Sequence, residues 1–329
     1  MKNKEINVLI TSASRKVWLV EAFKDALKRE KIRGKVISVE LSRLSAALYV
    51  SDRYYLIPPS SDKNFIQHIL RLCKKEKIKL LIPTRDEELI IFAKNREIFC
   101  KRGINVMISN PETIEICNDK YKFYQFLKKN KIPAPITILP SQFNLLNLKY
   151  PLIIKSRKGS GGKNVFMANN KRELEFFVRY IDEPIIQEFA EGKEYTVDLF
   201  SDFKGKIITA VPRERIEVVS GESYKGQTVR DLKIIRISKI FAGKLTIVGH
   251  ITLQFIKSRN SVKLIEVNPR FGGGAMLGIK AGYDTPRLLI RLAAGRKVKL
   301  KSTGFIEDLI MLRYTKDLFI LNGRVFNQR

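Results

Sequence analysis

Cysteine and histidine are scarce in this chain of 329 residues, which contains three cysteines and two histidines. The cysteines (Cys73, Cys100 and Cys117) are widely spaced, odd in number and form no Cys-x-x-Cys pair. Neither a disulfide framework nor a cysteine-ligated metal site is therefore expected, and reduced thiols of a cytoplasmic protein fit the pattern. His68 lies in an amphipathic helical pattern and His250 opens a strand pattern, so both are expected to be structural. No residue set typical of Ser/His/Asp or Cys/His catalysis is evident.

Long apolar runs are also missing. No segment approaches the roughly 20 apolar residues that span a bilayer, so no membrane partner is expected. The N-terminal sequence MKNKEINVLITSASR has too short an apolar stretch for a signal peptide and resembles a first β-strand. With 44% hydrophobic residues, the composition is that of an ordinary globular protein long enough for two or three domains.

Acidic residues are too few to balance the basic ones, since 33 Asp and Glu face 62 Lys and Arg and leave a net charge of +29. Such a charge suits binding to nucleic acid or to an anionic surface. The lysines are spread over all predicted helices, however, and the aromatics are not interleaved with arginine as in a stacking platform. A nucleic-acid partner is therefore not expected, whereas small anionic substrates would be attracted.

Strand and helix patterns alternate over the first 110 residues, which predicts a parallel, doubly wound α/β sheet. The turn after the first strand, TSASR, lacks the Gly-x-Gly-x-x-Gly fingerprint of dinucleotide-binding folds. Ligands of such sheets bind at the carboxyl ends of strands. Ser12, Ser14, Arg15 and the segment Pro83–Glu88 are therefore candidate substrate contacts, although helix caps and solvated turns explain them equally well.

The remaining sequence predicts a second, more β-rich unit of α+β character. A helix is expected over residues 121–131, then a proline-marked link and a strand–loop–strand over 150–168. Long β arms are expected at Lys206–Val211 and Ile234–Ile237. A helix beginning near Asp284 and a basic tail close the chain.

The segment LIEVNPRFGGG contains the clearest candidate site. Glu266 and Asn268 are two apart in a predicted strand, so their side chains point to the same face. A tight hairpin centred near Asn260 would place Gln254 across from Glu266. Three oxygen-bearing side chains then converge beside Arg270 and three glycines, which suits Mg²⁺ carrying ATP phosphates. A surface hairpin with a polar edge is the alternative for this segment taken alone.

A lysine followed by a glycine-rich turn forms a second candidate site. Lys155 ends a strand and can reach a phosphate from a fixed position. Gly159, Ser160, Gly161 and Gly162 form a turn whose backbone N–H groups can approach phosphate oxygens like a lid. The spacing is not that of a P-loop.

The segment IIQEFAEGKEY has the composition of a connector between two lobes. Its extended backbone could pair with an adenine edge, which makes Gln187, Glu188 and Phe189 candidate nucleotide contacts. Glu194 could accept hydrogen bonds from ribose hydroxyls. A solvated strand turn is the alternative for each of these residues.

The order and spacing of these features resemble the ATP-grasp superfamily. The likeness rests on a succession along the chain: Lys120, Lys155 with its glycine turn, the QEF–GKE connector, Arg213, Gln254, and Glu266-x-Asn268-x-Arg270. Within the superfamily, the synthetase domains of the carbamoyl phosphate synthetase large subunit are the most similar, because their metal ligands follow the same Gln…Glu-x-Asn pattern. The resemblance covers residues from about 111 to 295, and the region before it looks like the pre-ATP-grasp domain.

The resemblance implies four segments: a Rossmann-like pre-ATP-grasp domain over 1–110, a small lobe with its lid over 111–187, a large lobe with the metal site over 188–300, and a basic tail over 301–329. It also implies that Lys120 and Lys155 bind phosphates and that Arg270, Arg213 and Lys155 act in catalysis. Two Mg²⁺ or Mn²⁺ ions would be held by Gln254, Glu266 and Asn268. Arg215 and the turn Ser220–Ser223 would approach the γ-phosphate and the acceptor.

The activity implied is a cytoplasmic ATP-dependent ligase that joins a small carboxylate to an amine through an acyl phosphate. The sequence GGGAMLGIKAGYD after Arg270 looks more like that of stand-alone amine ligases than of carbamoyl phosphate synthetases. Two alternatives stay open: an enzyme that phosphorylates bicarbonate or carbamate, and a non-catalytic ATP-sensing or nucleic-acid-associated protein. The expected partners are small-molecule carboxylate and amine substrates, and a homodimer is left open.

Overall fold

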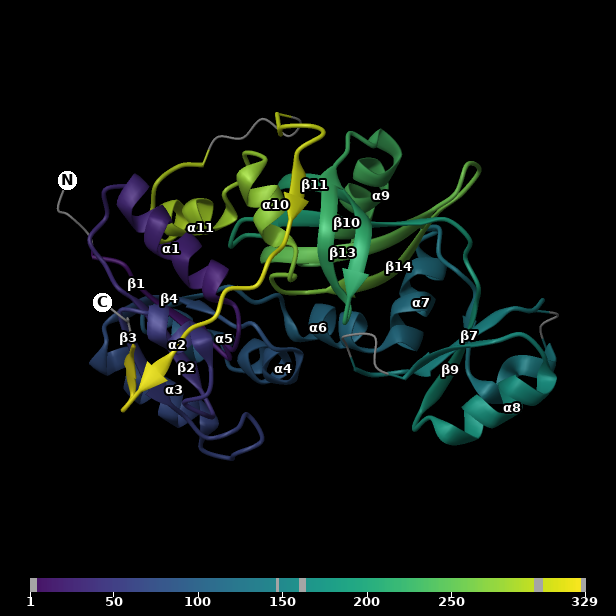
Figure 1. The fold of residues 1–329 in the computed structure, drawn as a ribbon, viewed down its shortest axis with the longest axis horizontal. Helices are drawn as coiled ribbons and strands as arrows, with labels where there is room; N and C mark the ends of the chain where they lie inside the picture. The colour runs from purple at the N-terminus through teal and green to yellow at the C-terminus, as the bar shows by residue number, and fades with distance from the viewer. Residues whose placement is uncertain (1–4, 146–147, 160–163, 299–303, 327–329) are drawn as a thin grey trace.

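The computed structural model describes residues 5–145, 148–159, 164–298 and 304–326. These residues form three main sheets, which Figure 1 shows with the N-terminal sheet on the left, the largest sheet in the upper centre and a small sheet on the right. None of the helices in these ranges has the length and apolar character that crossing a membrane requires.

The N-terminal domain contains a five-stranded parallel sheet in the order β3-β2-β1-β4-β5. Its strands are β1 (Asn7–Thr11), β2 (Val36–Glu40), β3 (Arg53–Leu56), β4 (Ile78–Ile82) and β5 (Asn105–Val106). The helices that follow these strands are α1 (Val17–Arg29), α2 (Ala46–Val50), α3 (Phe65–Lys75), α4 (Asp86–Lys94) and α5 (Arg96–Cys100). The predicted doubly wound sheet is confirmed.

This sheet is buried on both faces, which explains its nearly continuous apolar strands. In β1, Val8 and Ile10 join a core with α1, whereas Leu9 joins the opposite core with α3 and α4. Strands β2 and β3 lie on one side of β1, and β4 lies on the other side. The strand order therefore reverses between β1 and β4, which is the switch point of the sheet.

A four-stranded antiparallel sheet in the order β6-β9-β7-β8 forms the small lobe. Its elements are β6 (Thr137–Ile138), the 3₁₀ helix η1 (Pro140–Leu145), β7 (Leu152–Ser156), β8 (Val165–Ala168), α8 (Lys171–Tyr180) and β9 (Pro184–Glu188). The preceding helices α6 (Pro111–Asn118) and α7 (Lys120–Lys129) instead place Cys117, Phe123 and Leu127 in the core of the large sheet. The Tyr150–Pro151 peptide bond before β7 is cis.

The large lobe is a six-stranded antiparallel sheet in the order β14-β13-β10-β11-β12-β15. Its elements are β10 (Lys193–Ser201), β11 (Ile207–Val219), β12 (Glu222–Thr228), α9 (Leu232–Ala242), β13 (Gly249–Lys257), β14 (Val262–Asn268), α10 (Ala275–Lys280), α11 (Thr285–Ala293) and β15 (Ile310–Leu312). The helix expected near Asp284 is confirmed as α11, which Asp284 caps.

One predicted β arm is wrong, because Ile234–Ile237 lies within helix α9. Asp231 caps this helix by accepting a hydrogen bond from the backbone N–H of Ile234. Ile234, Ser238 and Phe241 are buried on one side, at the spacing of helical turns. This periodicity outweighs the β-propensity of the isoleucines.

The N-terminal domain and the large lobe share one apolar core. Phe271, just after β14, packs edge-on against Trp18 and Phe23 of α1, at ring-centroid distances of 6.3 and 6.2 Å. Beside this core, the nearly buried Glu30 carboxylate receives hydrogen bonds from Arg287, Arg291 and Arg296. These arginines hold the pKa of Glu30 below its usual range against the effect of burial.

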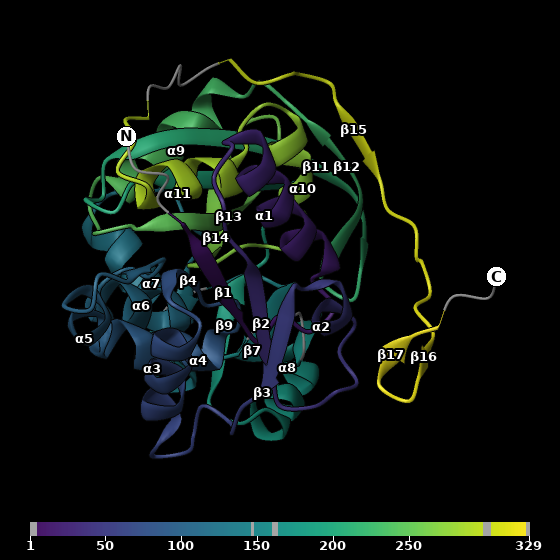
Figure 2. The ribbon, with the colours of Figure 1, turned by 90° about the vertical axis from the view of Figure 1, so that its left-hand side faces the viewer.

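The segment expected as a basic tail partly joins the large sheet, because β15 pairs with β12. The chain then leaves the sheet and ends in a small hairpin of β16 (Ile320–Leu321) and β17 (Arg324–Val325). Figure 2 shows this segment in yellow, running down the right-hand side of the view.

Candidate functional site

The hairpin of β13 and β14 has the predicted geometry. Gln254 pairs directly with Glu266, and Asn268 pairs with Thr252 one pleat further along. The register shifts between Gln254 and Phe255, which marks an irregularity beside the three oxygen-bearing side chains. Gln254, Glu266 and Asn268 are half-buried, whereas Leu253, Phe255 and Val267 face the core. The sheet thus holds one carboxylate and two amides on a single accessible face.

Two lysines, one at the start of α7 and one on β7, lie within electrostatic range of Glu266. Lys155 on β7 is buried and donates a hydrogen bond from Nζ to Gln187 Oε1 at 2.9 Å. Burial lowers the pKa of Lys155 to about 8, with a further lowering from Lys120, while the Glu266 carboxylate opposes the shift. Burial also lowers the pKa of Lys120, and Glu266 and Asp86 oppose that shift.

The position of Lys120 follows from the cap of α7. The Asp119 carboxylate accepts hydrogen bonds from the backbone N–H groups of Tyr121 and Lys122 and binds the Arg157 guanidinium. Lys120 therefore starts its helix beside the end of β7, where its Nζ donates to the Gly159 carbonyl at 2.7 Å. The start of α7 and the end of β7 thus place Lys120 and Lys155 beside the hairpin of β13 and β14.

Most of the predicted glycine-rich lid lies outside the described residues. This applies to Ser160, Gly161 and Gly162, whose predicted phosphate contacts stay predictions. Gly159, the last described residue before them, has a φ of 107°, which favours glycine.

The connector joins β9 of the small lobe to β10 of the large lobe. Gln187 bridges Lys155 and Thr137, since its Nε2 donates to Thr137 Oγ1 at 2.7 Å. Glu188 accepts hydrogen bonds from Lys263 Nζ and the Ile136 backbone N–H. All of these contacts are internal to the protein, so the predicted role of Gln187 and Glu188 in nucleotide binding stays a prediction.

The next two connector residues are more accessible. Phe189 is 40% exposed, and half-exposed Glu194 binds Arg215 Nη1 at 2.8 Å. Arg215 also reaches the predicted acceptor turn, because its Nη2 donates to the Gly221 carbonyl. The predicted roles of Phe189 with adenine and of Glu194 with ribose are not tested by these contacts.

Arg213 is placed differently from a ligand-facing arginine. Its side chain is 1% exposed and forms two hydrogen bonds with Asp198, at 2.7 and 2.9 Å. This pairing holds the pKa of Asp198 at about 2 against the effect of burial. Its Nη1 lies so close to Gly274 that a Cβ there would approach it to 2.5 Å. Arg213 thus links β11 to β10 beneath the turn Gly272–Gly274. Its predicted catalytic role stays a prediction.

His250 completes this buried group, as expected for a structural histidine. Its ring stacks on Phe271 at 4.2 Å, and its Nδ1 lies 3.2 Å from Thr285 Oγ1. Its Nε2 lies 3.4 Å from Asp198 Oδ1 without hydrogen-bond geometry.

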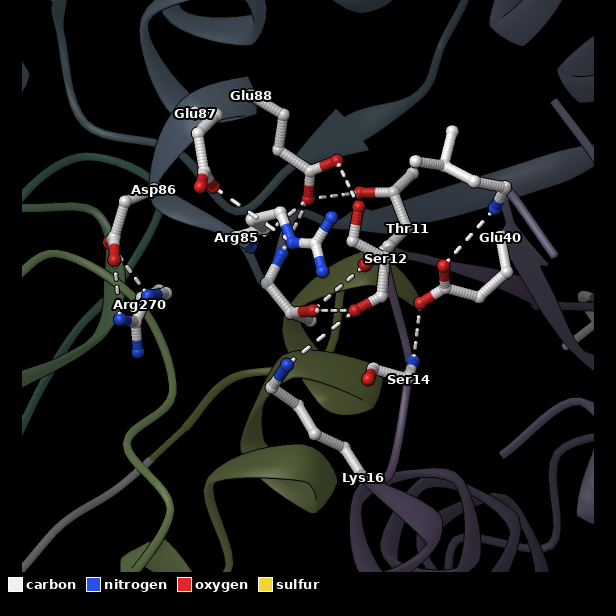
Figure 3. A network of polar contacts seen from close by, with 12 residues as sticks. Thr11, Ser12, Ser14, Lys16, Glu40, Arg85, Asp86, Glu87, Glu88 and Arg270 are labelled. Carbon is white, nitrogen blue, oxygen red and sulfur yellow. Dashed lines mark hydrogen bonds and ion pairs between the residues drawn. The ribbon is translucent and has the colours of Figure 1, made fainter. Parts of the chain in front are cut away.

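Arg270 connects the metal-site hairpin to the N-terminal domain. Its guanidinium forms hydrogen bonds of 2.7 and 2.6 Å with the Asp86 carboxylate at the start of α4, and it also donates to Asn268 Oδ1 at 3.3 Å. Figure 3 shows this pair beside the loops at the carboxyl ends of β1 and β4. A predicted metal ligand and a residue of the predicted segment Pro83–Glu88 therefore contact the same arginine.

At this edge of the N-terminal sheet, the polar groups form a network around Glu88 (Figure 3). The buried Glu88 carboxylate accepts hydrogen bonds from the hydroxyls of Thr11 and Ser12 and from the backbone N–H of Thr84. Burial raises the pKa of Glu88, and these hydrogen bonds oppose the shift. Burial and the nearby Arg270 lower the pKa of Lys16 to about 8.

Glu222 in the turn Ser220–Ser223 binds two arginines from distant parts of the chain. One is the exposed Arg15 after β1, at 3.0 Å, and the other is Arg313 after β15. Arg313 also donates to the Gly273 carbonyl, next to the metal-site hairpin. The C-terminal segment therefore contacts the turn Gly272–Gly274. The sequence patterns did not predict this contact.

The donor set fits a magnesium ion that arrives with a nucleotide. The described residues contain no group of three or more His, Cys, Asp or Glu suited to a metal ion. Glu266 supplies the single carboxylate, and Gln254 and Asn268 supply neutral amide oxygens. Mg²⁺ is commonly bound by one or two carboxylates together with substrate phosphates. Phosphate charge is therefore needed to complete such a site.

Several residues of this region were not singled out from the sequence. Glu40 is the last residue of β2 and accepts a hydrogen bond from the backbone N–H of Ser14. Lys16 lies two residues after Ser14, at the start of α1. The rule that ligands lie at carboxyl ends of parallel strands could have identified Glu40. Asp198, an acid between apolar residues of a strand, signalled a buried partner. Arg313 carries no comparable local signal.

Two family models match this chain. Residues 117–274 match a model described as an ATP-grasp domain, and residues 8–107 match one described as a PylC-like N-terminal domain.

Curated relatives include the carbamoyl phosphate synthase large chain of a Thermoanaerobacter species, 26% identical over 305 residues, which covers 86% of this chain and 28% of the relative. The corresponding protein of Thermoplasma acidophilum is 29% identical over 273 residues, covering 75% of this chain and 26% of the relative. The chain thus spans about a quarter of the length of these relatives.

Solved structures share the fold at low sequence identity. The biotin carboxylase domain of Hydrogenobacter thermophilus 2-oxoglutarate carboxylase, in complex with MgADP, ADP and bicarbonate, is similar with a TM-score of 0.74 and 17% identity, over 92% of this chain and 73% of that chain. The N5-carboxyaminoimidazole synthetase of Staphylococcus aureus, complexed with ADP, has a TM-score of 0.72 and 17% identity, over 91% and 80% of the two chains.

The metal-site hairpin, the paired lysines and the Rossmann-like sheet before them agree with these matches. The chain is therefore similar to ATP-grasp domains over residues 117–274 and to PylC-like N-terminal domains over residues 8–107.

Proposed function

We propose that this protein is an ATP-dependent ligase that joins a small carboxylate to an amine through an acyl phosphate. The observation that carries the proposal is the convergence of two chain-distant cations and one oxygen-rich hairpin. Lys120 and Lys155 both lie within electrostatic range of Glu266, although one starts helix α7 and the other is on strand β7. Glu266 in turn faces Gln254 across the hairpin.

The chemistry needs an activated carboxylate, because a free carboxylate shares its negative charge between two oxygens and resists attack by an amine. In the first step a carboxylate oxygen bonds to the γ-phosphorus of ATP, the bond from that phosphorus to the β–γ bridging oxygen breaks, and ADP leaves. In the second step the amine nitrogen bonds to the acyl carbon, phosphate leaves and the amine loses a proton. Both steps depend on positioning and on stabilising negative charge.

The residues of the chain would divide this work by position. Lys120 and Lys155 would bind phosphate oxygens, and the lowered pKa of Lys155 would return towards its ordinary value beside that negative charge. Gln254, Glu266 and Asn268 would hold Mg²⁺ or Mn²⁺, two ions in the full complex. When bound, the metal neutralises charge on the phosphate oxygens. Arg270, fixed by Asp86, would orient the hairpin towards the N-terminal domain.

The connector residues Gln187, Glu188, Phe189 and Glu194 would hold the nucleoside. The supporting observation is their place in the chain: Gln187 and Glu188 end β9, which pairs with β7, Phe189 follows them, and Glu194 is near the start of β10. Phe189 presents an accessible aromatic surface, and the exposed Glu194 carboxylate can still accept further hydrogen bonds.

Phosphorylation of bicarbonate is a second candidate. It is supported by relatives named carbamoyl phosphate synthase large chain and by the fold shared with a biotin carboxylase domain bound to bicarbonate. Bicarbonate would then replace the organic carboxylate in the first step.

The test is ADP release from Mg-ATP in the presence of pooled carboxylates and amines, with bicarbonate assayed separately. Glu266→Gln serves as the inactive variant because it removes one charge and keeps the size of the side chain. Glu217→Gln, which changes a half-exposed carboxylate on β11 of the same sheet, is the matched control. Stimulation by an organic pool that Glu266→Gln abolishes supports ligation, whereas stimulation by bicarbonate alone supports the second candidate. Equal background in all proteins and pools would refute catalysis.

A further inference from the structure

A small cavity lies at the carboxyl edge of the N-terminal parallel sheet. It has a volume of about 150 Å³ and is lined by loops that follow four different strands. Ser12 follows β1, Glu40 ends β2, Ile57 follows β3, and Arg85 precedes α4 after β4. The volume corresponds to roughly five water molecules, which limits a ligand to a small molecule.

The position of this cavity is the one where open α/β sheets bind ligands. The strand order reverses between β1 and β4, and the crevice outside the carboxyl ends at such a switch point is the usual ligand site. Ser12 and Thr84 lie on the two sides of this reversal and are linked by a hydrogen bond of 2.7 Å from Thr84 Oγ1 to the Ser12 carbonyl.

The polar lining favours an ammonium group and disfavours a phosphate. Glu40, Glu87 and Glu88 contribute three carboxyl groups against the single guanidinium of Arg85. This excess of acid is opposite in sign to the net charge of +29 of the whole protein. The turn after β1 also lacks the glycines with which related sheets approach phosphates.

Two charged side chains of the lining are available for a ligand. Glu88 and Glu40 are occupied by hydrogen bonds that fix their own loops. By contrast, Glu87 is 73% exposed, and its contact with Arg85, which is 45% exposed, is long at 3.9 Å. A pair this exposed and this long stabilises the protein little, so a ligand can separate it at low cost.

The remaining walls are apolar. Ile57 and Phe65 line the cavity, and Phe65, the first residue of α3, is buried in the core. A ligand that carries one cation, one anion and a small apolar group therefore matches the cavity.

We propose that this cavity binds a small apolar α-amino acid and that this amino acid is the amine substrate of the ligase. Glu87 receives the ammonium group, Arg85 receives the carboxylate, and the side chain of the amino acid packs against Ile57 and Phe65. The assignment as amine substrate rests on the proposed ligase function, whereas binding of the amino acid does not.

The cavity is near the metal-site hairpin, as the second ligation step requires. Glu87 directly follows Asp86, whose carboxylate accepts hydrogen bonds of 2.7 and 2.6 Å from the Arg270 guanidinium. Figure 3 shows Glu87, Arg85 and the Arg270–Asp86 pair in one region. An amine held by Glu87 would thus lie within electrostatic range of the residue that follows the predicted metal ligands.

The experiment measures binding of defined amino acids to the full chain by saturation-transfer NMR and calorimetry, with and without Mg²⁺ and a non-hydrolysable ATP analogue. The probes are glycine and the L and D forms of alanine, valine and leucine. Each ligand that binds is compared with its N-acetyl and its amide derivative. We expect at least one amino acid to bind and both of its derivatives to bind about ten-fold more weakly, because each lacks one charge.

The variants are Glu87→Gln and Arg85→Gln, with the exposed Glu97→Gln and Arg71→Gln as matched controls in the same domain. We expect the first two to raise the Kd of the amino acid about ten-fold, with the Kd of the ATP analogue unchanged and the controls like wild type. No binding of any probe, equal binding of the N-acetyl derivative, or unchanged affinity in Glu87→Gln and Arg85→Gln would each overturn the site.

The same proteins separate failure of the site from failure of the proposed function. Glu266→Gln should bind the amino acid normally while releasing no ADP. An amino acid that binds at the cavity but never stimulates ADP release in wild type would refute its role as substrate and leave the binding site standing. ADP release stimulated by other amines, unaffected in Arg85→Gln, would refute the cavity as the amine site while the ligase function stands.

Discussion

Replacing Lys155 with methionine should make the ligand-free protein more stable at neutral pH. Lys155 is buried, and its pKa of about 8 lies well below the ordinary value of 10.5. Keeping this ammonium charged inside the protein therefore costs roughly 3 kcal/mol at pH 7. Methionine removes that cost and fills similar space, but it leaves Gln187 Oε1 without its donor, which costs about 1–2 kcal/mol. We expect Lys155→Met to raise the free energy of unfolding by about 1–2 kcal/mol at pH 7.

The pH dependence gives this prediction its sharpest form. The folded pKa lies below the unfolded one, so between about pH 8 and 10.5 the unfolded state holds more protons and the wild type gains stability as pH rises. By pH 10 the cost of burying Lys155 should have fallen below about 1 kcal/mol. The stability difference between variant and wild type should therefore shrink by about 2 kcal/mol from pH 7 to pH 10.

The assay is urea denaturation of both proteins at pH 7 and pH 10, followed by circular dichroism. Lys158→Met, which removes an exposed ammonium from the same strand end, is the control and should change stability by no more than about 0.5 kcal/mol. A difference between Lys155→Met and wild type that is the same at both pH values would refute the idea that Lys155 is a desolvated cation. Under the proposed function, Lys155→Met should also weaken ATP binding, so stability and affinity should move in opposite directions.

Four further predictions concern the large lobe. Asp198→Ala leaves the Arg213 guanidinium buried and unpaired, and should lower the free energy of unfolding by about 3–5 kcal/mol in urea titrations; a loss below about 1 kcal/mol would contradict the pairing. Because the pKa of Asp198 is held at about 2, this pair should support the fold above pH 4 and lose its effect as pH falls from 3.8 through about 2, which an acid titration of wild type against Asp198→Asn would detect. Gly274→Ala places a Cβ within 2.5 Å of Arg213 Nη1 and should cost about 1–3 kcal/mol, whereas unchanged thermal unfolding would show that the arginine can move aside. With Glu266 as the single carboxylate of the metal site, Mn²⁺ detected by electron paramagnetic resonance should bind weakly alone and more tightly with ADP, and Glu266→Gln should remove the increase.

Local patterns were sufficient to predict the alternating strands and helices of the N-terminal sheet and the hairpin of β13 and β14, but not the strands β15–β17 in the expected tail. Alternation in GHITLQFI and LIEVN, with a polar link between them, predicted the pairing of Gln254 with Glu266, because a tight hairpin leaves the register little freedom. The four-residue window Ile234–Ile237 was misassigned because isoleucine favours strands locally. Only the burial of residues one turn apart showed the helix α9.

Contacts between distant segments were beyond the reach of these patterns. The pairing of Arg270 with Asp86, the cluster of three arginines on Glu30 and the meeting of Arg313 with Glu222 each join residues far apart in the chain. The sequence around one partner does not identify the other, because an ion pair requires only two opposite charges that the fold brings close together. Such pairs form where the domains happen to bring the side chains together.

The sequence by itself determined the alternating elements of the N-terminal sheet, the register of the β13–β14 hairpin and the chemical nature of the candidate ligands, since these depend on residues close together in the chain. Only the tertiary structure decided which of the polar residues are buried against one another and which are accessible. Arg213 resembled a catalytic arginine in its position along the chain, yet the packing of β10 against β11 buries it on Asp198. Arg85 and Glu87 resembled an ordinary helix start, yet the reversal of strand order places them at a cavity. Burial and proximity are properties of the assembled sheets, and they set the electrostatic environment that local sequence does not encode.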